Sequence, residues 1–123
     1  MSNGYEDLDV YNRAFSLALK VYKFSQILPK IEQYAMADQI RRASTSICAN
    51  IAEGHAKAHF SKAEFKRFLT MSAGSSQEMK VWLKFCYELD YLDEKLWQEW
   101  DDEYNQITRM LNGLIRKISP TPH

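Results

Sequence analysis

The sequence predicts an all-α protein, an antiparallel four-helix bundle with up-down-up-down topology, and three observations indicate it. Only four glycines and three prolines occur among 123 residues, and the prolines lie outside the helical stretches. Within those stretches apolar residues recur at steps of three and four, the spacing of one face of an α-helix. Short segments separate four such stretches, so neighbouring helices should run antiparallel. We expect a single domain over residues 1–123.

The first helix is expected over residues 9–28, because the residue before Pro29 avoids the α region. Its main seam contains Tyr11, Ala14, Phe15, Ala18, Val21, Tyr22 and Leu28. The second helix is expected over residues 33–54, with Gly54 in a left-handed cap at its end. Alanine, serine and threonine cover much of the second helix, and small residues let neighbouring backbones approach closely. We therefore place it at the centre of the bundle.

The third helix is expected over residues 61–89. Ser61 and Glu64 have capping-box spacing, with serine accepting from the helix and glutamate reaching back. Its seam contains Phe65, Phe68, Ser72, Ser75, Met79, Trp82, Cys86 and Leu89. The fourth helix is expected over residues 93–118, capped by Asp93. Its seam contains Trp97, Trp100, Tyr104, Ile107, Leu111, Leu114 and Ile118.

The helices carry more apolar residues than one small bundle needs, since a core stripe takes about three positions in seven. The surplus residues are Val10, Leu17, Phe24 and Ile27 in the first helix and Leu96, Met110 and Ile115 in the fourth. Exposed apolar patches usually mark an interface. We therefore predict a homo-oligomer whose contact includes these residues. The alternative is that neighbouring helices and the N-terminal segment cover them within one subunit.

The net charge is zero, but the charges are unevenly spread. Residues 41–67 contain six Lys or Arg against Glu53 and Glu64, whereas residues 88–103 contain eight acidic residues against Lys95. Such asymmetry can orient a partner or join one subunit to the next. The alternative is two solvated helix ends of opposite sign.

No motif indicates catalysis. His55 and His59 are four residues apart, but Gly54 and Ser61 flank them, so we expect solvated histidines on a turn instead of a metal site. No glutamate has a histidine three positions later, as a di-iron bundle requires. Some helical-bundle ribonucleases use an arginine followed four to six residues later by histidine, and this chain has no such pair. We predict a protein that is not an enzyme, with no cofactor and no metal.

Cys48 and Cys86 fall within apolar helical patterns, and we expect them to be reduced core residues. No apolar run approaches the roughly 18–20 residues of a membrane span, so the expected location is the cytoplasm, away from membranes.

Several polar residues stand on otherwise small or apolar helix surfaces. They are Arg41, Arg42, Asn50, Glu53 and Glu78. We interpret them as a structural network that fixes helix register. A ligand site is the alternative.

Five blocks along the chain carry a family resemblance. They are Tyr5-Glu6-Asp7-Leu8-Asp9-Val10-Tyr11, Gln39-Ile40-Arg41-Arg42-Ala43, Ala49-Asn50-Ile51-Ala52-Glu53-Gly54, Glu64-Phe65-x-Arg67-Phe68-Leu69 and Arg109-Met110-Leu111-Asn112-Gly113-Leu114-Ile115. In this order they resemble the four-helix-bundle proteins of the 23S ribosomal RNA intervening-sequence family, also called the S23 ribosomal protein family. Some members are encoded inside insertions within rRNA genes, and their molecular function is unsettled.

The resemblance implies a bundle that assembles into a ring-like homopentamer. It also implies kinship with the accessory protein of diversity-generating retroelements, a basic pentamer that binds nucleic acid and a reverse transcriptase. This chain departs from the family pattern in two places. Cys48 replaces a common proline, and His55-Ala56 replaces an aromatic-glycine pair. Its zero net charge also departs from the basic accessory protein, which weakens the transfer of nucleic-acid binding.

Two functions fit these observations. The first is a non-catalytic oligomer that binds RNA or another nucleic acid; its candidate contacts are Lys57, Lys62, Lys66 and Arg67. A ring repeats this patch, and each lysine that neutralises a phosphate releases counterions, which strengthens binding. Phe60 is the only aromatic residue directly within this patch, so a stacking platform is not evident. The second is a protein-interaction scaffold with no nucleic-acid binding, which the neutral charge and the acidic segment favour.

Overall fold

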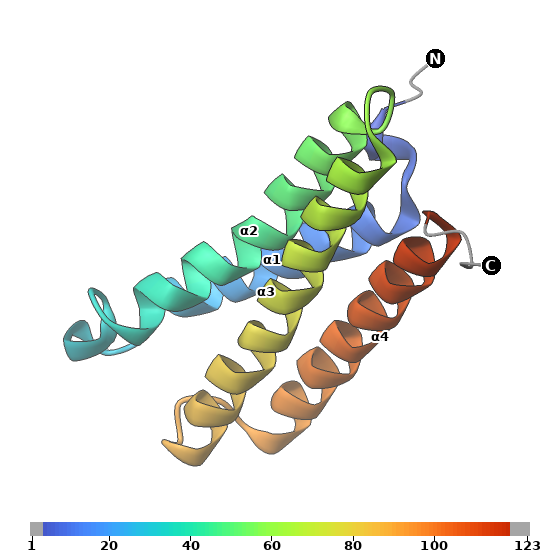
Figure 1. Ribbon diagram of the computed structural model, residues 1–123. Coiled ribbons are helices and arrows are strands. Elements are labelled where there is room, and N and C mark those ends of the chain that lie inside the picture. The colour runs from blue at the N-terminus through green and yellow to red at the C-terminus, as the bar shows by residue number, and fades with distance from the viewer. Residues whose placement is uncertain (1–3, 119–123) are drawn as a thin grey trace.

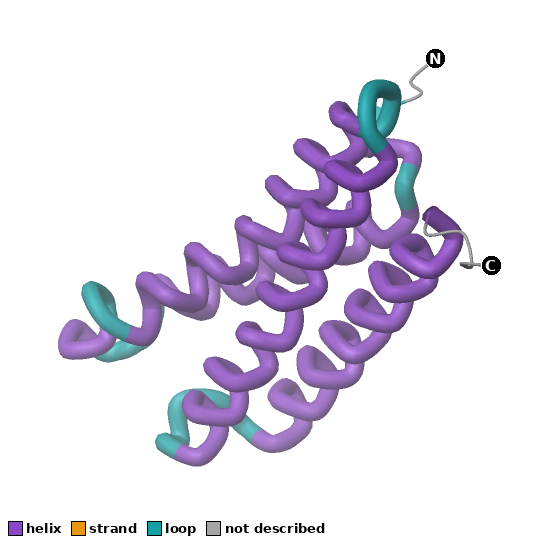
Figure 2. The backbone as a smooth tube through the Cα atoms, viewed as in Figure 1, coloured by secondary structure: helices purple, strands orange, loops and turns teal. Residues whose placement is uncertain are grey.

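The computed structural model describes residues 4–118, which form four long α-helices packed side by side (Figure 1). The helices are α1 (Asp9–Gln26), α2 (Met36–Lys57), α3 (Lys62–Glu88) and α4 (Glu94–Ile118), with short 3-10 helices η1 (Tyr5–Asp7) and η2 (Lys30–Glu32). Residues 4–118 contain no strand (Figure 2). Each helix packs against the next in chain order, and α1 also contacts α4. The α1 and α3 backbones do not approach each other, so these helices lie diagonally across the bundle. The predicted all-α four-helix bundle is confirmed.

The turn between α1 and α2 is longer than predicted. Helix α1 ends at Gln26, and η2 followed by a turn delays the start of α2 to Met36. The amide of Gln33 explains the delay, because its Nε2 donates to the carbonyl oxygens of Ser25 and Leu28 at 2.9 Å each. The Ser25 carbonyl lies in the last turn of α1 and that of Leu28 lies two residues beyond its end, so the Gln33 side chain holds the turn against the end of α1.

Gly54 does not cap α2, so the prediction of a left-handed helix end is wrong. The helix continues to Lys57, and no glycine in the described chain has positive φ. A Cβ atom on Gly54 would lie 2.8 Å from the Cβ of Phe68 and 3.3 Å from the carbonyl oxygen of Phe65. The missing side chain therefore lets α2 and α3 cross closely at this point.

Both predicted N-caps are confirmed. Ser61 Oγ accepts the backbone N–H of Glu64 at 3.1 Å, and Asp93 Oδ1 accepts that of Leu96 at 2.8 Å. The reciprocal half of the capping box is absent from the described contacts, because the Glu64 carboxylate accepts two hydrogen bonds from Arg67 instead, at 3.0 and 3.1 Å.

Hydroxyl groups join the three best-packed helices through the core. Ser72 Oγ donates to the carbonyl oxygen of Ile47 at 2.8 Å, which links α3 to α2. Ser76 Oγ donates to the carbonyl oxygen of Tyr104 at 3.2 Å and accepts from Thr108 Oγ1 at 2.8 Å, which links α3 to α4. The small middle of α3 thus packs tightly against both neighbours, and the buried hydroxyls of Ser72 and Ser76 both have partners.

Candidate functional site

The four residues predicted to bind nucleic acid lie together at the corner where α2 passes into α3. Lys57 closes α2, and Lys62, Lys66 and Arg67 occupy the first two turns of α3. The turn between them is fixed by backbone hydrogen bonds, including those from the N–H groups of Phe60 and Ser61 to the Lys57 carbonyl oxygen at 3.0 and 2.9 Å. The four residues are therefore neighbours in the fold, and their binding of nucleic acid stays a prediction.

These four cations differ in how far other side chains of the bundle already contact them. The Arg67 guanidinium forms an ion pair with Glu64 and lies 4.5 Å from the centroid of the Phe68 ring, and Lys57 Nζ lies 5.9 Å from the same ring. The hydrogen bond to Arg67 lowers the pKa of Glu64. Lys62 and Lys66 are exposed and form no ion pair within residues 4–118. These two lysines are the most available to an external anion.

The fold adds two further cations that sequence reasoning missed. Arg116 and Lys117 lie in the last turn of α4, which ends at the same end of the bundle as the α2–α3 corner (Figure 1). About fifty residues separate them from Lys66, so only the antiparallel topology brings them there. We call this surface the basic end; it comprises Lys57, Lys62, Lys66, Arg67, Arg116 and Lys117.

The acidic segment lies at the opposite end, where α3 passes into α4 (Figure 1). One of its carboxylates, that of Glu103, accepts two hydrogen bonds from Arg13 of α1 at 2.7 and 3.0 Å. The α2–α3 part of the basic run and the acidic segment therefore lie at opposite ends of the bundle, whereas Arg41 and Arg42 lie near the start of α2, at the end away from the α2–α3 corner.

The residues predicted to form one polar network do not do so. The Arg41 guanidinium is half-buried and donates to Ser25 Oγ at 3.0 Å and to the Gln33 carbonyl oxygen at 2.8 Å, which ties α2 to α1. Asn50 donates to Ser46 Oγ at 2.9 Å. The other three are exposed: Arg42 pairs with Asp38, Glu78 accepts from Trp82 Nε1, and Glu53 lies on the surface of α2. Arg41 and Asn50 thus make structural contacts as predicted, but at two separate places. The prediction that all five residues form one network is wrong.

Neither the histidines nor the cysteines form a reactive site. The rings of His55 and His59 lie 6.4 Å apart between centroids, and no three His, Cys, Asp or Glu side chains gather as metal ligands in the described chain. Burial raises the pKa of the Cys48 thiol to about 11 and that of Cys86 to about 12. Both cysteines are free thiols and stay protonated near neutral pH.

The predicted oligomer interface requires a correction. Val10, Leu17 and Phe24 are buried in the core of one subunit, with exposed fractions of 2%, 4% and 9%, so the prediction that they contact another subunit is wrong. Leu96, Met110 and Ile115 are half-buried and pack against that core. Only Ile27 is largely exposed, at 80%. Val10, Leu17 and Phe24 are thus covered within one subunit, as the alternative supposed, and the Phe24 ring meets that of Trp100 of α4 at 5.6 Å between centroids.

Helix α1 nevertheless has an uncovered apolar face, on the side opposite to the one predicted. Phe15, Leu19 and Tyr22 are exposed at 45%, 50% and 38% and form the wall of a groove of about 360 Å³. We call it the α1–α2 groove. The residues that line it are Tyr5, Tyr11, Phe15, Ala18, Leu19 and Tyr22 along one wall and Thr45, Cys48, Ala49 and Ala52 along a floor formed by α2.

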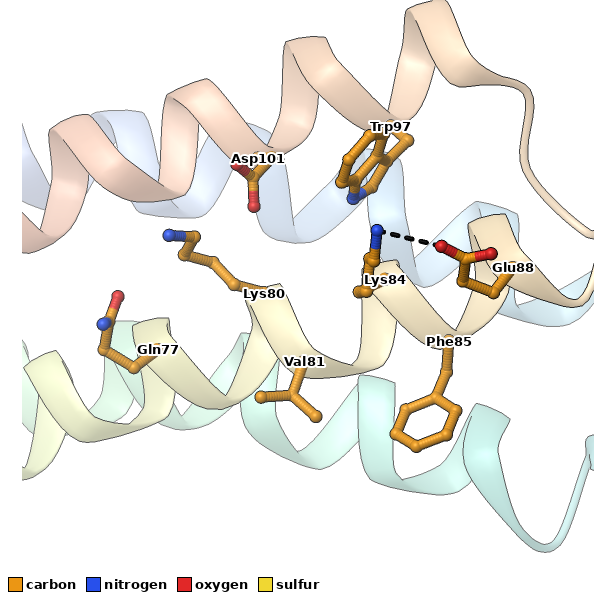
Figure 3. A pocket seen from close by; sticks show the side chains of 8 residues that line it. All are labelled: Gln77, Lys80, Val81, Lys84, Phe85, Glu88, Trp97 and Asp101. Atoms are coloured by element: carbon orange, nitrogen blue, oxygen red, sulfur yellow. Dashed lines mark ion pairs between the residues drawn. The ribbon is translucent and has the colours of Figure 1, made fainter.

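A second apolar surface runs along α3. The α3 stripe comprises Met71, Gly74, Glu78, Val81, Phe85 and Leu89, all exposed and spaced by three or four residues. Its four large apolar side chains are exposed at 45–52%. Figure 3 shows Val81 and Phe85 projecting from α3 away from Trp97 and Asp101 of α4, beside a hollow of about 550 Å³.

Comparison with known proteins gives the chain a family and a fold relative. No functionally curated protein is similar enough in sequence to match it. A crystal structure of a protein of unknown function, from the S23 ribosomal protein family of Bacteroides thetaiotaomicron, is similar with a TM-score of 0.77 and 23% sequence identity. The similarity covers 87% of this chain and 95% of that one. None of the helices in residues 4–118 has the length and apolar character needed to cross a membrane. The family model for the 23S rRNA-intervening sequence protein matches residues 6–113, and the chain belongs to that family.

Proposed function

We propose that this protein is a non-catalytic bundle that self-assembles and presents several copies of its basic end to the phosphates of RNA. The observation that carries the proposal is the presence of two separate uncovered apolar surfaces, the α1–α2 groove and the α3 stripe. Because α1 and α3 lie diagonally, the two surfaces face different directions. One copy then places its stripe in the groove of the next, and such head-to-tail contacts form a ring when the rotation between copies closes. The ring-like homopentamer implied by the resemblance is the closed form that we propose.

The chemistry of the two surfaces supports this pairing. The groove floor consists of small side chains, which allow the backbone of a foreign helix to approach. Val81 and Phe85 project from the stripe. The stripe also contains Gly74, and a Cβ atom added to Gly74 would meet no atom within 4 Å. Covering a half-exposed Phe or Leu stabilises an interface by about 1 kcal/mol, so four or five such side chains per contact contribute substantially.

The assembly is tested with one substitution on each surface. Leu19→Glu in the groove and Phe85→Glu in the stripe each place a charge in the proposed contact, so each variant should be monomeric by size-exclusion chromatography with light scattering. The unmodified protein should have a multiple of the 14.4 kDa monomer mass. Tyr34→Glu is the matched control, because Tyr34 is 96% exposed and belongs to neither surface. A monomeric unmodified protein would refute the assembly.

Mixing the two monomeric variants distinguishes head-to-tail pairing from a symmetric dimer. The Leu19→Glu variant keeps an intact stripe and the Phe85→Glu variant keeps an intact groove. Together they should form a heterodimer of twice the monomer mass that cannot grow further. If the interface joined like surfaces, mixing would restore nothing.

The basic end supports the RNA-binding part of the proposal. Each phosphate neutralised by a lysine or arginine releases counterions, so affinity should fall steeply with salt. The triple variant Lys62→Ala/Lys66→Ala/Arg67→Ala should lose affinity for structured RNA and reduce the salt dependence. The matched control Lys20→Ala/Lys23→Ala/Lys30→Ala removes three exposed cations from the other end of the bundle and should change little.

The scaffold remains the second candidate, because the net charge is zero and the acidic segment gathers at one end. It predicts no RNA binding even at low salt, together with an intact assembly. That combination of results would favour a polypeptide over RNA as the partner of this protein.

A further inference from the structure

The ring of Phe60 stands almost alone at the basic end. Its side chain is 90% exposed, in contrast to Phe68 at the same corner, which is 8% exposed and covered by Arg67 and Lys57. Phe65 is half-buried and meets the edge of the His55 ring at 6.1 Å between centroids. Among the aromatic residues of the α2–α3 corner, Phe60 is thus the one with an open ring face.

The backbone that carries Phe60 is held firmly. Its own N–H donates to Lys57, and the N–H groups of Ala58 and Ser61 donate to the carbonyl oxygens of His55 and Lys57 at 3.2 and 2.9 Å. Immediately afterwards Ser61 caps α3. The backbone of such a turn therefore needs no further ordering when a flat ligand covers the ring.

Three lysines lie near Phe60 in the chain. Lys57 and Lys62 lie within three residues on either side, and Lys66 follows one helical turn after Lys62. Tyr34, at the opposite end, is just as exposed, but its nearest charges in the chain are mostly acidic: Glu32, and then Lys30 and Asp38 four residues away on either side. The Phe60 surface therefore combines an open aromatic face with positive charge, whereas the Tyr34 surface does not.

We propose that Phe60 is a stacking platform for an unpaired base, with Lys57 and Lys62 beside it for the adjoining phosphates. The inference rests on the proposed RNA binding and narrows it to single-stranded segments such as loops and ends. A base within a duplex has both faces covered by its neighbours in the stack, whereas an unpaired base has a face free for an aromatic ring.

The test compares a fluorescein-labelled single-stranded RNA of about 12 nucleotides with the same RNA annealed to its complement. The protein should bind the single strand more tightly than the duplex. Phe60→Leu keeps an apolar side chain without an aromatic face and should weaken single-strand binding by about 5- to 150-fold while leaving duplex binding unchanged. Phe60→Trp should retain or strengthen it, and Tyr34→Leu is the control that should have no effect.

Salt dependence provides a second readout. Phe60→Leu should leave the slope of log affinity against log salt unchanged, because stacking releases no counterions, whereas Lys62→Ala/Lys66→Ala should reduce it. Equal binding of both RNA forms, together with no effect of Phe60→Leu, would overturn the platform and leave the proposed RNA binding standing. Absence of binding to either form at low salt would overturn both.

Discussion

Gly54 is the residue at which the distance between α2 and α3 is set. We predict that Gly54→Ala destabilises the protein by about 1–3 kcal/mol, because the added methyl group meets Phe68 and the Phe65 backbone and forces the helices apart. Gly113→Ala is the matched control, since a Cβ atom there meets nothing within 4 Å. It should stabilise α4 by about 0.5–1 kcal/mol through helix propensity. Urea unfolding measures both, and equal effects of the two substitutions would contradict the assigned role.

Individual polar residues were the least predictable from sequence. A helical pattern does not reveal which neighbour a long side chain will reach. Arg41 was recognised as structural, but its partners Ser25 and Gln33 lie on α1 and on the turn that follows it, and only the fold brings them together. The Glu78 carboxylate accepts a hydrogen bond from Trp82 Nε1 on its own helix, so it does not join the predicted network.

At the scale of elements, the end of α3 stores backbone strain. Asp90 has φ of 64°, in the left-handed region that favours glycine, while the N–H of Tyr91 donates to the Cys86 carbonyl oxygen at 2.8 Å to close the helix. We predict that Asp90→Gly stabilises the protein by about 1 kcal/mol. Asp90→Asn separates conformation from charge, because asparagine is neutral but keeps the Cβ atom and the size of the aspartate side chain. Thermal unfolding checks both, and an equal gain from Asn and Gly would assign the effect to charge.

The existence of the helices and the starts of α3 and α4 were predictable from the three-four spacing and the caps, but the end of α1, both ends of α2 and the direction of each face were not. In α1 apolar residues surround most of the helix, so periodicity alone did not distinguish the Val10, Leu17 and Phe24 side from the Phe15 and Tyr22 side. In α3 the buried register passes through Ser76 and Leu83, one position from the predicted Ser75 and Trp82. Small neighbouring residues make the two registers nearly equivalent in sequence, and packing against α2 and α4 selects between them.

For the whole molecule, the sequence showed that charge is uneven, and topology determined where the charges lie. The runs at 41–67 and 88–103 were visible in the chain, but the contribution of Arg116 to the basic end depends on the antiparallel course of α4. The same topology places the α1–α2 groove and the α3 stripe on different faces. Both proposed activities therefore depend on helix order more than on any single motif.

The stability of the whole bundle should decrease in alkaline solution. Burial raises the pKa of Cys48 to about 11 and of Cys86 to about 12, from an ordinary value of 9.0, and it raises the pKa of the Tyr104 phenol as well. Above about pH 9 the unfolded chain releases thiol protons that the folded chain retains, so the unfolded state binds fewer protons and the free energy of unfolding falls as pH rises. The stabilisation is fully present below pH 9.0 and is lost progressively towards the folded values.

Each buried thiol should lower the free energy of unfolding by about 1 kcal/mol per pH unit within that window. Urea unfolding at about pH 8 and about pH 10 measures the change. In the Cys48→Ala/Cys86→Ala variant the absolute stability falls because small cavities form, but the loss between the two pH values should be smaller than in the unmodified protein. The comparison therefore rests on the difference between pH values and not on either stability alone. An identical loss in both proteins would show that the thiols do not control alkaline unfolding and would leave Tyr104 as the group to test with Tyr104→Phe.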